Sequence, residues 1–431
     1  TEIYTLSLHD ALPISIITAR AGVVYTDVVL ATPRTEPAIL PHYNANEHLT
    51  AGAKEEGAIH IRDVCNFGGT PCNFGSATPA YLRIIRGVEE PPRDTEALAR
   101  TSDINLGAAR MREIIGYTEI QSDNSVGVRV PANMPLALSF VDENGKALRV
   151  NGSTGGSLRH QNWISVRPGE VLECNGCHTG SGTTPDSTAP HGRLNAEPTT
   201  SSTTLASTIN PIPSLTPNPA ALSYPVDNDP SAASCGLLYT YWTSGCPSII
   251  HYEQHIQTIW SQSRAHPADP MQSASCIDCH NSTFMRDNAI DEIPPTQLEL
   301  TADVEPGDNN NRYRSYFELL TTRPYQIVRD GVLRDCNTVL DPVLDGEGNP
   351  VLDENDQPVS QNACPDSPNP TNVTASMSRS GAHFSNGFFS RFETPGNSHF
   401  GFLTPGERRL IAEWLDIGGQ YYNNHFDAPD N

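Results

Sequence analysis

The sequence predicts an α+β protein, with a β-rich, sandwich-like N-terminal region followed by a mainly α-helical domain. Three observations predict this class. From Ile16 to about Val171, short β-branched runs alternate with Pro and Gly. After about residue 246, apolar residues recur at helical spacing. Two Cys-x-x-Cys-His motifs also occur, one where the halves meet and one within the helical half.

In the β-rich region the expected strands lie at residues 22–30, 58–64, 81–88, 126–130 and 136–142. After the last of these comes Glu143-Asn144-Gly145. Asn-Gly between apolar alternations is a strong hairpin signal, so residues 147–150 are predicted as the return strand. We expect an antiparallel sandwich or partial barrel, or the end of a larger β domain. Residues 162–170 lead directly into the first motif, so a strand would bring that motif to the sheet edge.

The two motifs are Cys174-Asn175-Gly176-Cys177-His178 and Cys276-Ile277-Asp278-Cys279-His280. Their pattern is typical of covalent haem c attachment, in which the thiols add to the vinyl groups and the histidine ligates the iron. Zinc ribbons and redox dithiols also use Cys-x-x-Cys, but neither requires the following histidine. With 14 His in 431 residues, its presence at both places by chance is improbable. The sequence therefore predicts two haem c groups, and a c-type cytochrome domain in the helical half. The residues expected to hold them are Cys174, Cys177, Cys276 and Cys279, through thioether bonds, and His178 and His280, as iron ligands.

The second axial position of each iron decides between two functions. A protein ligand there favours electron transfer, whereas an open position lets the iron bind a small molecule. For the first haem we predict His191, with His160 as the alternative. For the second haem we predict His399, which lies just before the final helix, with His383 as the alternative. Methionine ligation is less supported, because the chain has only five Met residues and Met271, Met285 and Met377 have no distinctive context.

Helical spacing of apolar residues occurs at 247–262 and 313–322. The final helix is the most clearly marked. Thr404 is a good N-cap, Pro405 suits the first helical position, and Glu407 completes a capping box. Its predicted buried stripe consists of Leu410, Ile411, Trp414, Leu415 and Ile417. Gly418 and Gly419 are expected to end the helix.

Two further patterns suggest metal sites. His251 and His255 are four residues apart, a spacing that can bind a metal, although a helix face near the haem rim is the favoured interpretation. An acidic insert offers carboxylates for calcium at Asp341, Asp345, Glu347, Asp353 and Asp356. Their spacing does not match an EF-hand, and Asp-Gly and Gly-Asn are ordinary turn sequences. We therefore favour a disulfide-closed hairpin there.

The remaining six cysteines form three local pairs with none left over. The predicted disulfides are Cys65–Cys72, Cys235–Cys246 and Cys336–Cys364. Disulfides and haem attachment both indicate an oxidising compartment, so we expect a periplasmic or extracellular bacterial protein. No apolar run approaches the ~20 residues of a membrane span. Residues 1–15 resemble a translated sequencing adaptor, so we expect the signal sequence to be missing from this fragment.

The charge balance limits the partners. A formal net charge of -23 excludes nucleic acid as an expected partner, because nucleic-acid binding needs clustered Lys and Arg. It favours attraction of a basic redox protein. The expected organisation is an artefact at 1–15, a β-rich domain truncated at its start at 16–173, a first haem site with a Ser/Thr/Pro-rich linker at 174–245, and a second c-type haem domain at 246–431.

Two runs resemble the hydrazine synthase alpha subunit family. The first is VPANMPLALSFVDENGKALRV together with NWISVRPGEVLECNGCH, and the second is HFGFLTPGERRLIAEWLDIGGQYYN. The resemblance extends over most of residues 110–431. It implies a β-propeller upstream and a di-haem C-terminal region. In that family a tyrosine shortly after the first motif ligates the iron, whereas Thr179 to Thr184 contain none here, which favours His178. The resemblance also implies a bis-histidine second haem, in agreement with His399.

The predicted function is electron transfer through two bis-histidine haems, with no residue assigned to catalysis. One alternative is a haem redox enzyme in which one iron stays open to a small nitrogen or oxygen species. The other is a structural subunit of a larger multihaem assembly or oligomer.

Overall fold

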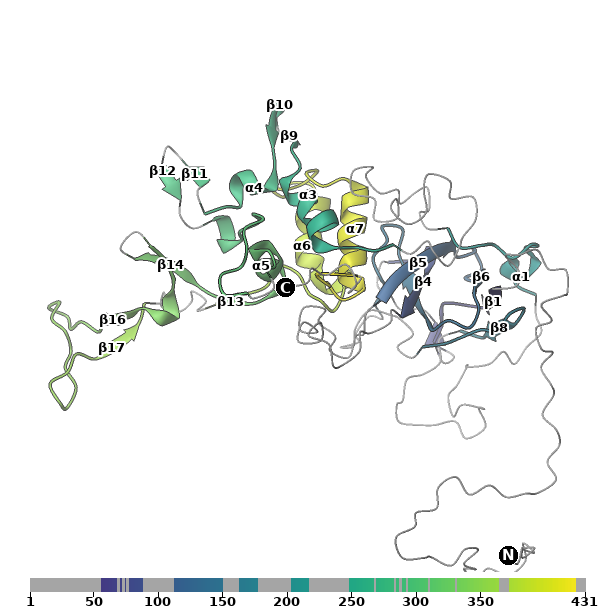
Figure 1. Ribbon diagram of the computed structural model, residues 1–431, viewed down its shortest axis with the longest axis horizontal. Coiled ribbons are helices and arrows are strands. Elements are labelled where there is room, and N and C mark those ends of the chain that lie inside the picture. The colour runs from purple at the N-terminus through teal and green to yellow at the C-terminus, as the bar shows by residue number, and fades with distance from the viewer. Residues whose placement is uncertain are drawn as a thin grey trace, which may run out of the picture. The chain divides into compact units, whose positions relative to one another are not determined.

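The computed structural model describes the chain in segments. They are residues 56–67, 70–71, 74, 77–87, 112–149, 163–176, 203–216, 248–266, 269–282, 284–286, 289–291, 294–308, 311–329, 332–363 and 372–423 (Figure 1). All belong to one compact unit, Leu49–Asn431. The predicted strand at 22–30 and the segment 1–15 lie outside them.

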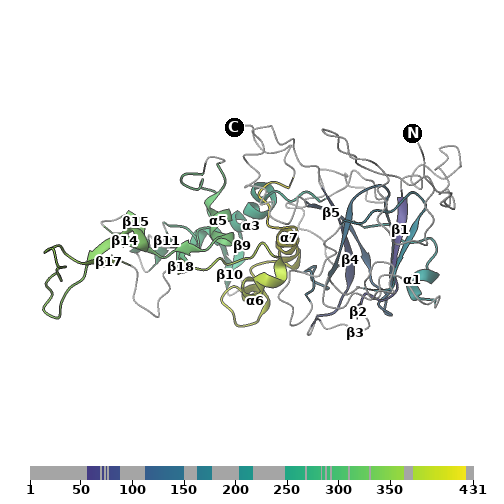
Figure 2. The ribbon, with the colours of Figure 1, turned by 90° about the horizontal axis from the view of Figure 1, so that it is seen from below.

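The β-rich region consists of two three-stranded sheets that share one hydrophobic core (Figures 1 and 2). The orders are β6-β1-β8 and β5-β4-β7. The strands are β1 (Glu56–Ile61), β4 (Tyr81–Gly87), β5 (Arg112–Glu119), β6 (Val126–Pro131), β7 (Leu136–Val141) and β8 (Val171–Cys174). Because side chains alternate between the faces of a strand, Ile59 and Val128 of one sheet meet Leu82 and Leu138 of the other. The predicted α+β class with a sandwich-like β region is confirmed.

The pairing differs from the prediction in two places. β8 runs parallel to β1, with Ile61 opposite Cys174, so the expectation of a wholly antiparallel region is wrong for this strand. A strand that returns through a long crossover can enter the edge in either direction, which sequence alternation does not reveal. The return strand after Gly145 is reduced to a single bridge between Val141 and Ala147.

The helical half contains the predicted helices in shorter form. The region 247–262 begins as a π-helix, η5 (Tyr252–Ile256), and continues as α3 (Gln257–Ser261). The other α-helices of this half are α4 (Cys276–Cys279), α5 (Arg314–Leu320), α6 (Asn386–Glu393) and α7 (Pro405–Asp416). One further helix, α1 (Leu205–Thr208), precedes this half and packs against β6. The 3-10 turns are η6 (Pro295–Gln297), η7 (Cys336–Thr338) and η8 (Ala382–Ser385).

Short antiparallel strand pairs also occur, the first between β1 and β4 in the β-rich region and the others in the helical half. They are β2 (Asn66–Phe67) with β3 (Thr70–Pro71), β9 (Arg264–His266) with β10 (Asp269–Ala274), β11 (Phe284–Arg286) with β12 (Ala289–Asp291), β13 (Arg323–Pro324) with β18 (Asn372–Val373), β14 (Gln326–Arg329) with β15 (Val332–Asp335), and β16 (Leu340–Pro342) with β17 (Ser360–Asn362). Within the described segments, no helix is long and apolar enough to cross a bilayer.

Helix α7 begins as the sequence predicts. The Thr404 hydroxyl accepts from the backbone N–H of Glu407 at 3.2 Å, and the Glu407 carboxylate accepts from the N–H of Thr404 at 2.7 Å. All five residues of the predicted stripe are fully buried. Gly418 and Gly419 follow with φ of 113° and 60°, where a residue with a Cβ would be strained.

A buried polar cluster joins α7 to the sheet β5-β4-β7. Arg83 of β4 donates to Asp416 at 2.7 Å, and both side chains are almost fully buried. Tyr117 of β5 donates to Glu413, which also pairs with Arg409. The sheet therefore has two buried faces, one on the sandwich core and one on the helices.

The acidic insert forms an arm, which we define as residues 340–362. Asp345 and Asp353 each use one carboxylate oxygen to accept two backbone N–H groups of the following turn, at 2.8–2.9 Å. Three backbone hydrogen bonds of 2.8 Å link Val343, Val351 and Val359 in a closed ring. These aspartates therefore have a turn-forming role, which agrees with the favoured hairpin over calcium binding.

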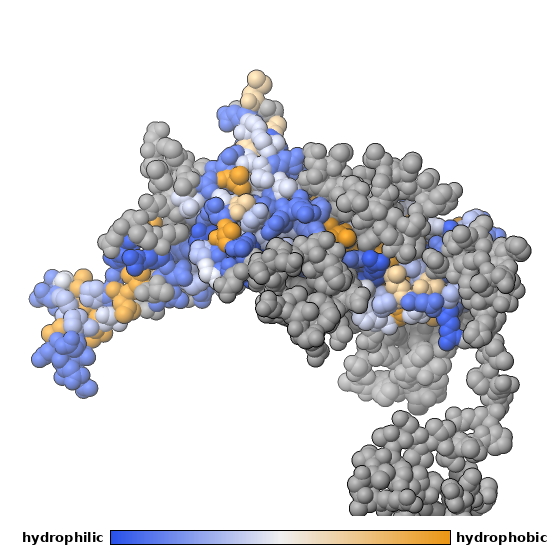
Figure 3. Space-filling view, in the orientation of Figure 1, coloured by the Kyte–Doolittle hydropathy of each residue, from blue (hydrophilic) through white to orange (hydrophobic). Residues whose placement is uncertain are grey.

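The surface of the arm combines hydrophilic and hydrophobic residues (Figure 3). Leu340, Leu344 and Leu352 are each at least half exposed. At the base of the arm, Cys336 is in a disulfide bond. Its predicted partner Cys364 lies outside the described residues, so the pairing stays a prediction.

Candidate functional site

A cavity of about 660 Å³ lies among the helices around the second motif. Cys276, Cys279, His280 and His399 all line it. Its remaining wall is largely apolar, with contributions from Trp260, Leu298, Leu300, Phe388, Phe392 and Phe402. Cofactor pockets are typically ~300–1,000 Å³ with apolar walls and a few polar groups. The cavity therefore has the size and lining of a cofactor site.

The local fold explains why both thiols face this cavity. Cys276 and Cys279 are three residues apart on the single turn of α4, which places them on one side of the helix. The carboxylate of Asp278, inside the motif, accepts from the N–H of Ser275 at 2.6 Å and so caps the turn. Neither cysteine is in a disulfide bond.

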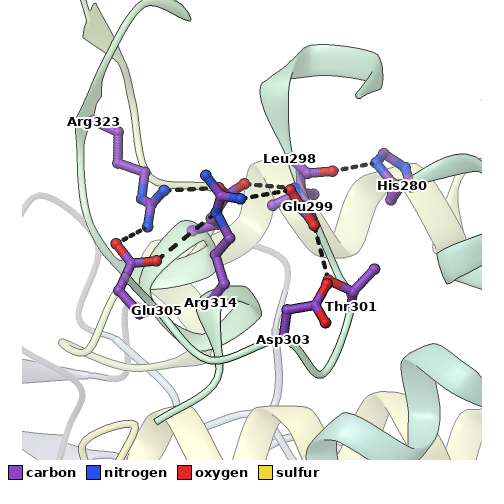
Figure 4. Close-up of polar contacts among 9 residues, drawn as sticks. His280, Leu298, Glu299, Thr301, Asp303, Glu305, Arg314 and Arg323 are labelled. Carbon is purple, nitrogen blue, oxygen red and sulfur yellow. Dashed lines mark hydrogen bonds and ion pairs between the residues drawn. The ribbon is translucent and has the colours of Figure 1, made fainter. Parts of the chain in front are cut away.

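His280 is oriented by a backbone carbonyl. Its Nδ1 lies 3.1 Å from the carbonyl oxygen of Leu298 (Figure 4). A protonated Nδ1 donating to this oxygen leaves Nε2 with the lone pair that a metal needs. Burial, with a smaller contribution from His399, lowers the pKa of His280. The neutral imidazole required for ligation is therefore favoured.

His399 faces His280 across the cavity. Their ring centres are 6.0 Å apart. Two imidazoles that share one metal through bonds of about 2 Å also have their centres about 6 Å apart. The Nδ1 of His399 lies 2.8 Å from the hydroxyl oxygen of Ser398. In the tautomer in which Nδ1–H donates to this oxygen, Nε2 keeps its lone pair. Burial, followed by the charge of Arg391, lowers the pKa of His399.

Two arginines near the cavity were not predicted from the sequence. Arg264 lies with Nη1 3.6 Å from the sulfur of Cys276 and pairs with Glu407 at 2.5 Å. Burial raises the pKa of the Cys276 thiol to about 11, and Arg264 opposes this increase. Arg391 is exposed and lines the cavity, where it supplies positive charge. Neither arginine belongs to a sequence motif, so only the folded chain identifies them.

The first motif begins at the end of β8. Cys174 packs against the sandwich core, and its carbonyl accepts from the N–H of Arg62 at 2.9 Å. Burial, then the charge of Glu173, raises the pKa of its thiol to about 11. His60, on the neighbouring strand, lies beside Glu173 but bonds Thr204 through Nε2 at 3.0 Å. Cys177, His178, His191 and His160 lie outside the described residues, so their ligand roles stay predictions.

Gly176, inside the first motif, lies against the loop of Cys65. A Cβ at this position would be 2.5 Å from the carbonyl oxygen of Asn66 and 2.8 Å from that of Asp63. The loop is fixed by the disulfide of Cys65 and by the bond from its N–H to the carboxylate of Asp63 at 2.8 Å. Glycine is therefore required for the motif to pack closely against this loop.

Changing Gly176 to Ala should lower the stability of the β-rich region by about 1–3 kcal/mol, the usual cost of overpacking. We also expect less haem at the first motif, because the motif can no longer reach its position. Urea unfolding and the haem-to-chain ratio measure both effects. Gly346→Ala is the matched control, since a Cβ there meets nothing within 4 Å. Equal values for the two variants would contradict this account of Gly176.

The alternative ligands lie elsewhere. His383, in η8, does not line the cavity, and its pKa is lowered by burial and then by Arg149.

His251 and His255 each accept a hydrogen bond at Nδ1. The backbone nitrogen of Asn423 lies 3.2 Å from Nδ1 of His251, and the backbone nitrogen of His251 lies 3.0 Å from Nδ1 of His255. Both therefore use Nδ1 as an acceptor, which suits a structural role. Across the described segments, no group of three or more His, Cys, Asp or Glu is arranged to hold a metal ion.

The predicted disulfides are described only in part. Cys65 is disulfide-bonded. Its predicted partner Cys72, and the pair Cys235 and Cys246, lie outside the described residues. Their pairing stays a prediction.

Comparison with known proteins bears on the β-rich region. Residues 80–179 match the family model of the hydrazine synthase alpha subunit middle domain. The match covers the first of the two resembling runs and the whole first motif, so the resemblance found in the sequence is confirmed over this segment. No curated protein sequence matches the chain.

A chain of the solved hydrazine synthase of Kuenenia stuttgartiensis is also similar, with 18% sequence identity and a TM-score of 0.46. The alignment covers 88% of this chain and 44% of that one. This chain thus spans less than half the length of the chain it matches.

Proposed function

We propose that this chain is a di-haem c-type cytochrome region that transfers electrons. The premise is the similarity of residues 80–179 to the hydrazine synthase alpha subunit middle domain. The proposed compartment is the periplasm or the extracellular space. The two thioether-bound haems would be ligated by His178 and His280, with distal ligands His191 and His399.

One observation carries the proposal, namely the cavity that combines Cys276, Cys279, His280 and His399. The residues present fit a haem. The two thiols come from one helical turn, and the two imidazoles are separated by the distance that a shared metal requires. Apolar walls of this size suit a porphyrin face.

Each residue has a distinct task in this site. A haem with two imidazole ligands, when bound, gives and accepts one electron. Cys276 and Cys279 would hold the porphyrin through thioether bonds. The carbonyl of Leu298 fixes the orientation of the His280 imidazole. Phe388 and Phe392 exclude water. Arg391 would pair with the propionate carboxylates of a bound haem.

The decisive experiment is a mass measurement of protein produced with a cytochrome c maturation system. We expect two added haem masses. A Cys276→Ser and Cys279→Ser variant should carry one haem fewer, because its second motif has no thiols for attachment. Cys336→Ser is the control for cysteine loss as such, because it breaks the disulfide of Cys336 but leaves both motifs intact and should keep two haems. Absence of any added porphyrin mass would overturn the proposal.

A second candidate function rests on the family match, which includes the first motif. In this candidate the haem at Cys174 keeps one open position and acts on a small nitrogen or oxygen species, within a larger multisubunit assembly. Carbon monoxide distinguishes the two candidates, because it binds a reduced five-coordinate haem and leaves a bis-histidine haem unchanged. Size measurement in solution tests the assembly.

A further inference from the structure

We propose that Glu318 is a positioning residue that sets the redox potential of the second haem through the peptide group between Leu298 and Glu299. The inference rests on the proposed function, since it requires haem on His280. Glu318 is on α5, and it is not among the residues that line the cavity. Its influence therefore has to pass through another group.

The connecting group is a single peptide unit whose C=O and N–H are both hydrogen-bonded. Its carbonyl oxygen, on Leu298, lies 3.1 Å from Nδ1 of His280. Its N–H, on Glu299, donates to the carboxylate of Glu318 at 2.5 Å. Figure 4 shows the first of these contacts beside the surrounding ion pairs. The result is a continuous hydrogen-bonded chain from imidazole to peptide to carboxylate.

Hydrogen bonds in such a chain polarise one another. An anion bound to the N–H makes the carbonyl of the same peptide more negative, and hence a stronger acceptor for the Nδ1 proton. Stronger acceptance at Nδ1 makes the imidazole of His280 more basic at Nε2. A more basic ligand stabilises the oxidised iron, so ionised Glu318 should lower the potential.

The backbone that presents Leu298 is held in an unusual conformation. Thr296 and Gln297 have φ of 57° and 54°, in the left-handed region that a β-branched residue rarely adopts. The side chain of Gln297 makes two hydrogen bonds of 3.0 Å with the backbone of Gln326, which brace this turn. Strained backbone persists where its surroundings fix it, and it is found at functional sites. The peptide is therefore preorganised between its two partners.

Glu318 is surrounded by charges of both signs. Arg323 of β13 lies 2.8 Å from its Oε1, and Arg314 of α5 lies 3.4 Å from the same atom. Glu299 and Tyr252 face it as well, from the peptide segment and from η5. Burial raises the pKa of Glu318 to about 7, while the N–H of Glu299 and the two arginines act to lower this pKa. The carboxyl therefore changes charge near neutral pH.

The test measures both haem potentials by spectroelectrochemical titration, with the second haem assigned from its change in a His399→Ala variant. Glu318→Gln should raise the reduction potential of the second haem. At a fixed applied potential, the ratio of reduced to oxidised haem should rise threefold to tenfold, and a tenfold rise corresponds to ~59 mV for one electron. In the wild type the reduction potential of this haem should fall as pH rises through about 7, because Glu318 ionises there. Glu318→Gln should remove this pH step.

Glu305→Gln is the matched control. Glu305 pairs with the same arginines, at 2.8 Å from Arg323 and 3.9 Å from Arg314, but it does not bond the peptide. It should leave the second potential and its pH step unchanged. Equal shifts in both variants, or no shift in Glu318→Gln with haem bound, would overturn this inference alone. The pH titration of the wild type needs no variant to fold. Absence of haem in the wild type would instead overturn the proposed function.

Discussion

Replacing His399 with Ala should convert the proposed second haem from a six-coordinate low-spin centre to a five-coordinate high-spin centre. The reason is geometric, because His399 is the side chain that faces His280 at 6.0 Å across the cavity. Alanine cannot reach a metal, and His266, the other histidine that lines the cavity outside the motif, packs edge-on against Phe402 with 5.1 Å between ring centres. About half of the low-spin absorbance should be lost, since the proposed first haem would keep its own ligands. The reduced variant should also bind carbon monoxide.

His383→Ala is the matched control for this prediction. His383 is another histidine near the final helices, but it faces Arg149 rather than the cavity. Its replacement should leave the optical spectrum unchanged. If His399→Ala retains the full low-spin spectrum, or if His383→Ala loses it, the assignment of the distal ligand is wrong.

Replacing Asp416 with Ala should lower the free energy of unfolding by about 3–5 kcal/mol, as expected when one partner of a buried ion pair is removed. The Asp416 carboxylate accepts from Arg83 at 2.7 Å and from the backbone N–H groups of Ala147 and Ala382 at 2.9 and 2.8 Å. The variant leaves the buried charge of Arg83 without this carboxylate, and two buried N–H groups lose their acceptor. Urea unfolding measures the loss.

The control is another Arg–Asp pair that is exposed. Arg329 pairs with Asp341, and their side chains are 42% and 37% accessible. Asp341→Ala should change stability by less than about 1 kcal/mol, because solvent already screens the pair. A loss in Asp416→Ala no larger than in this control would show that the buried cluster does not hold α7 on the sheet.

Local sequence was sufficient for several elements. Thr404, Pro405 and Glu407 define the start of α7, because a capping box depends only on residues three apart. The turn at Gly145 was predicted for the same reason, and the strands β1, β4, β6 and β7 were visible in their alternation. In contrast, the parallel direction of β8 was missed, because pairing direction depends on the path of the intervening chain.

By itself the sequence determined the α+β class, the two Cys-x-x-Cys-His motifs and the choice of His399 as a candidate ligand, because each is carried by neighbouring residues or by spacing along one element. Only the tertiary structure placed His399 beside His280, and only it revealed the path from Leu298 through Glu299 to Glu318. These contacts join residues 18 to 119 positions apart, and local propensity does not encode such distances. They arise because packing of the apolar faces of α3, α5, α6 and α7 fixes where each polar group points.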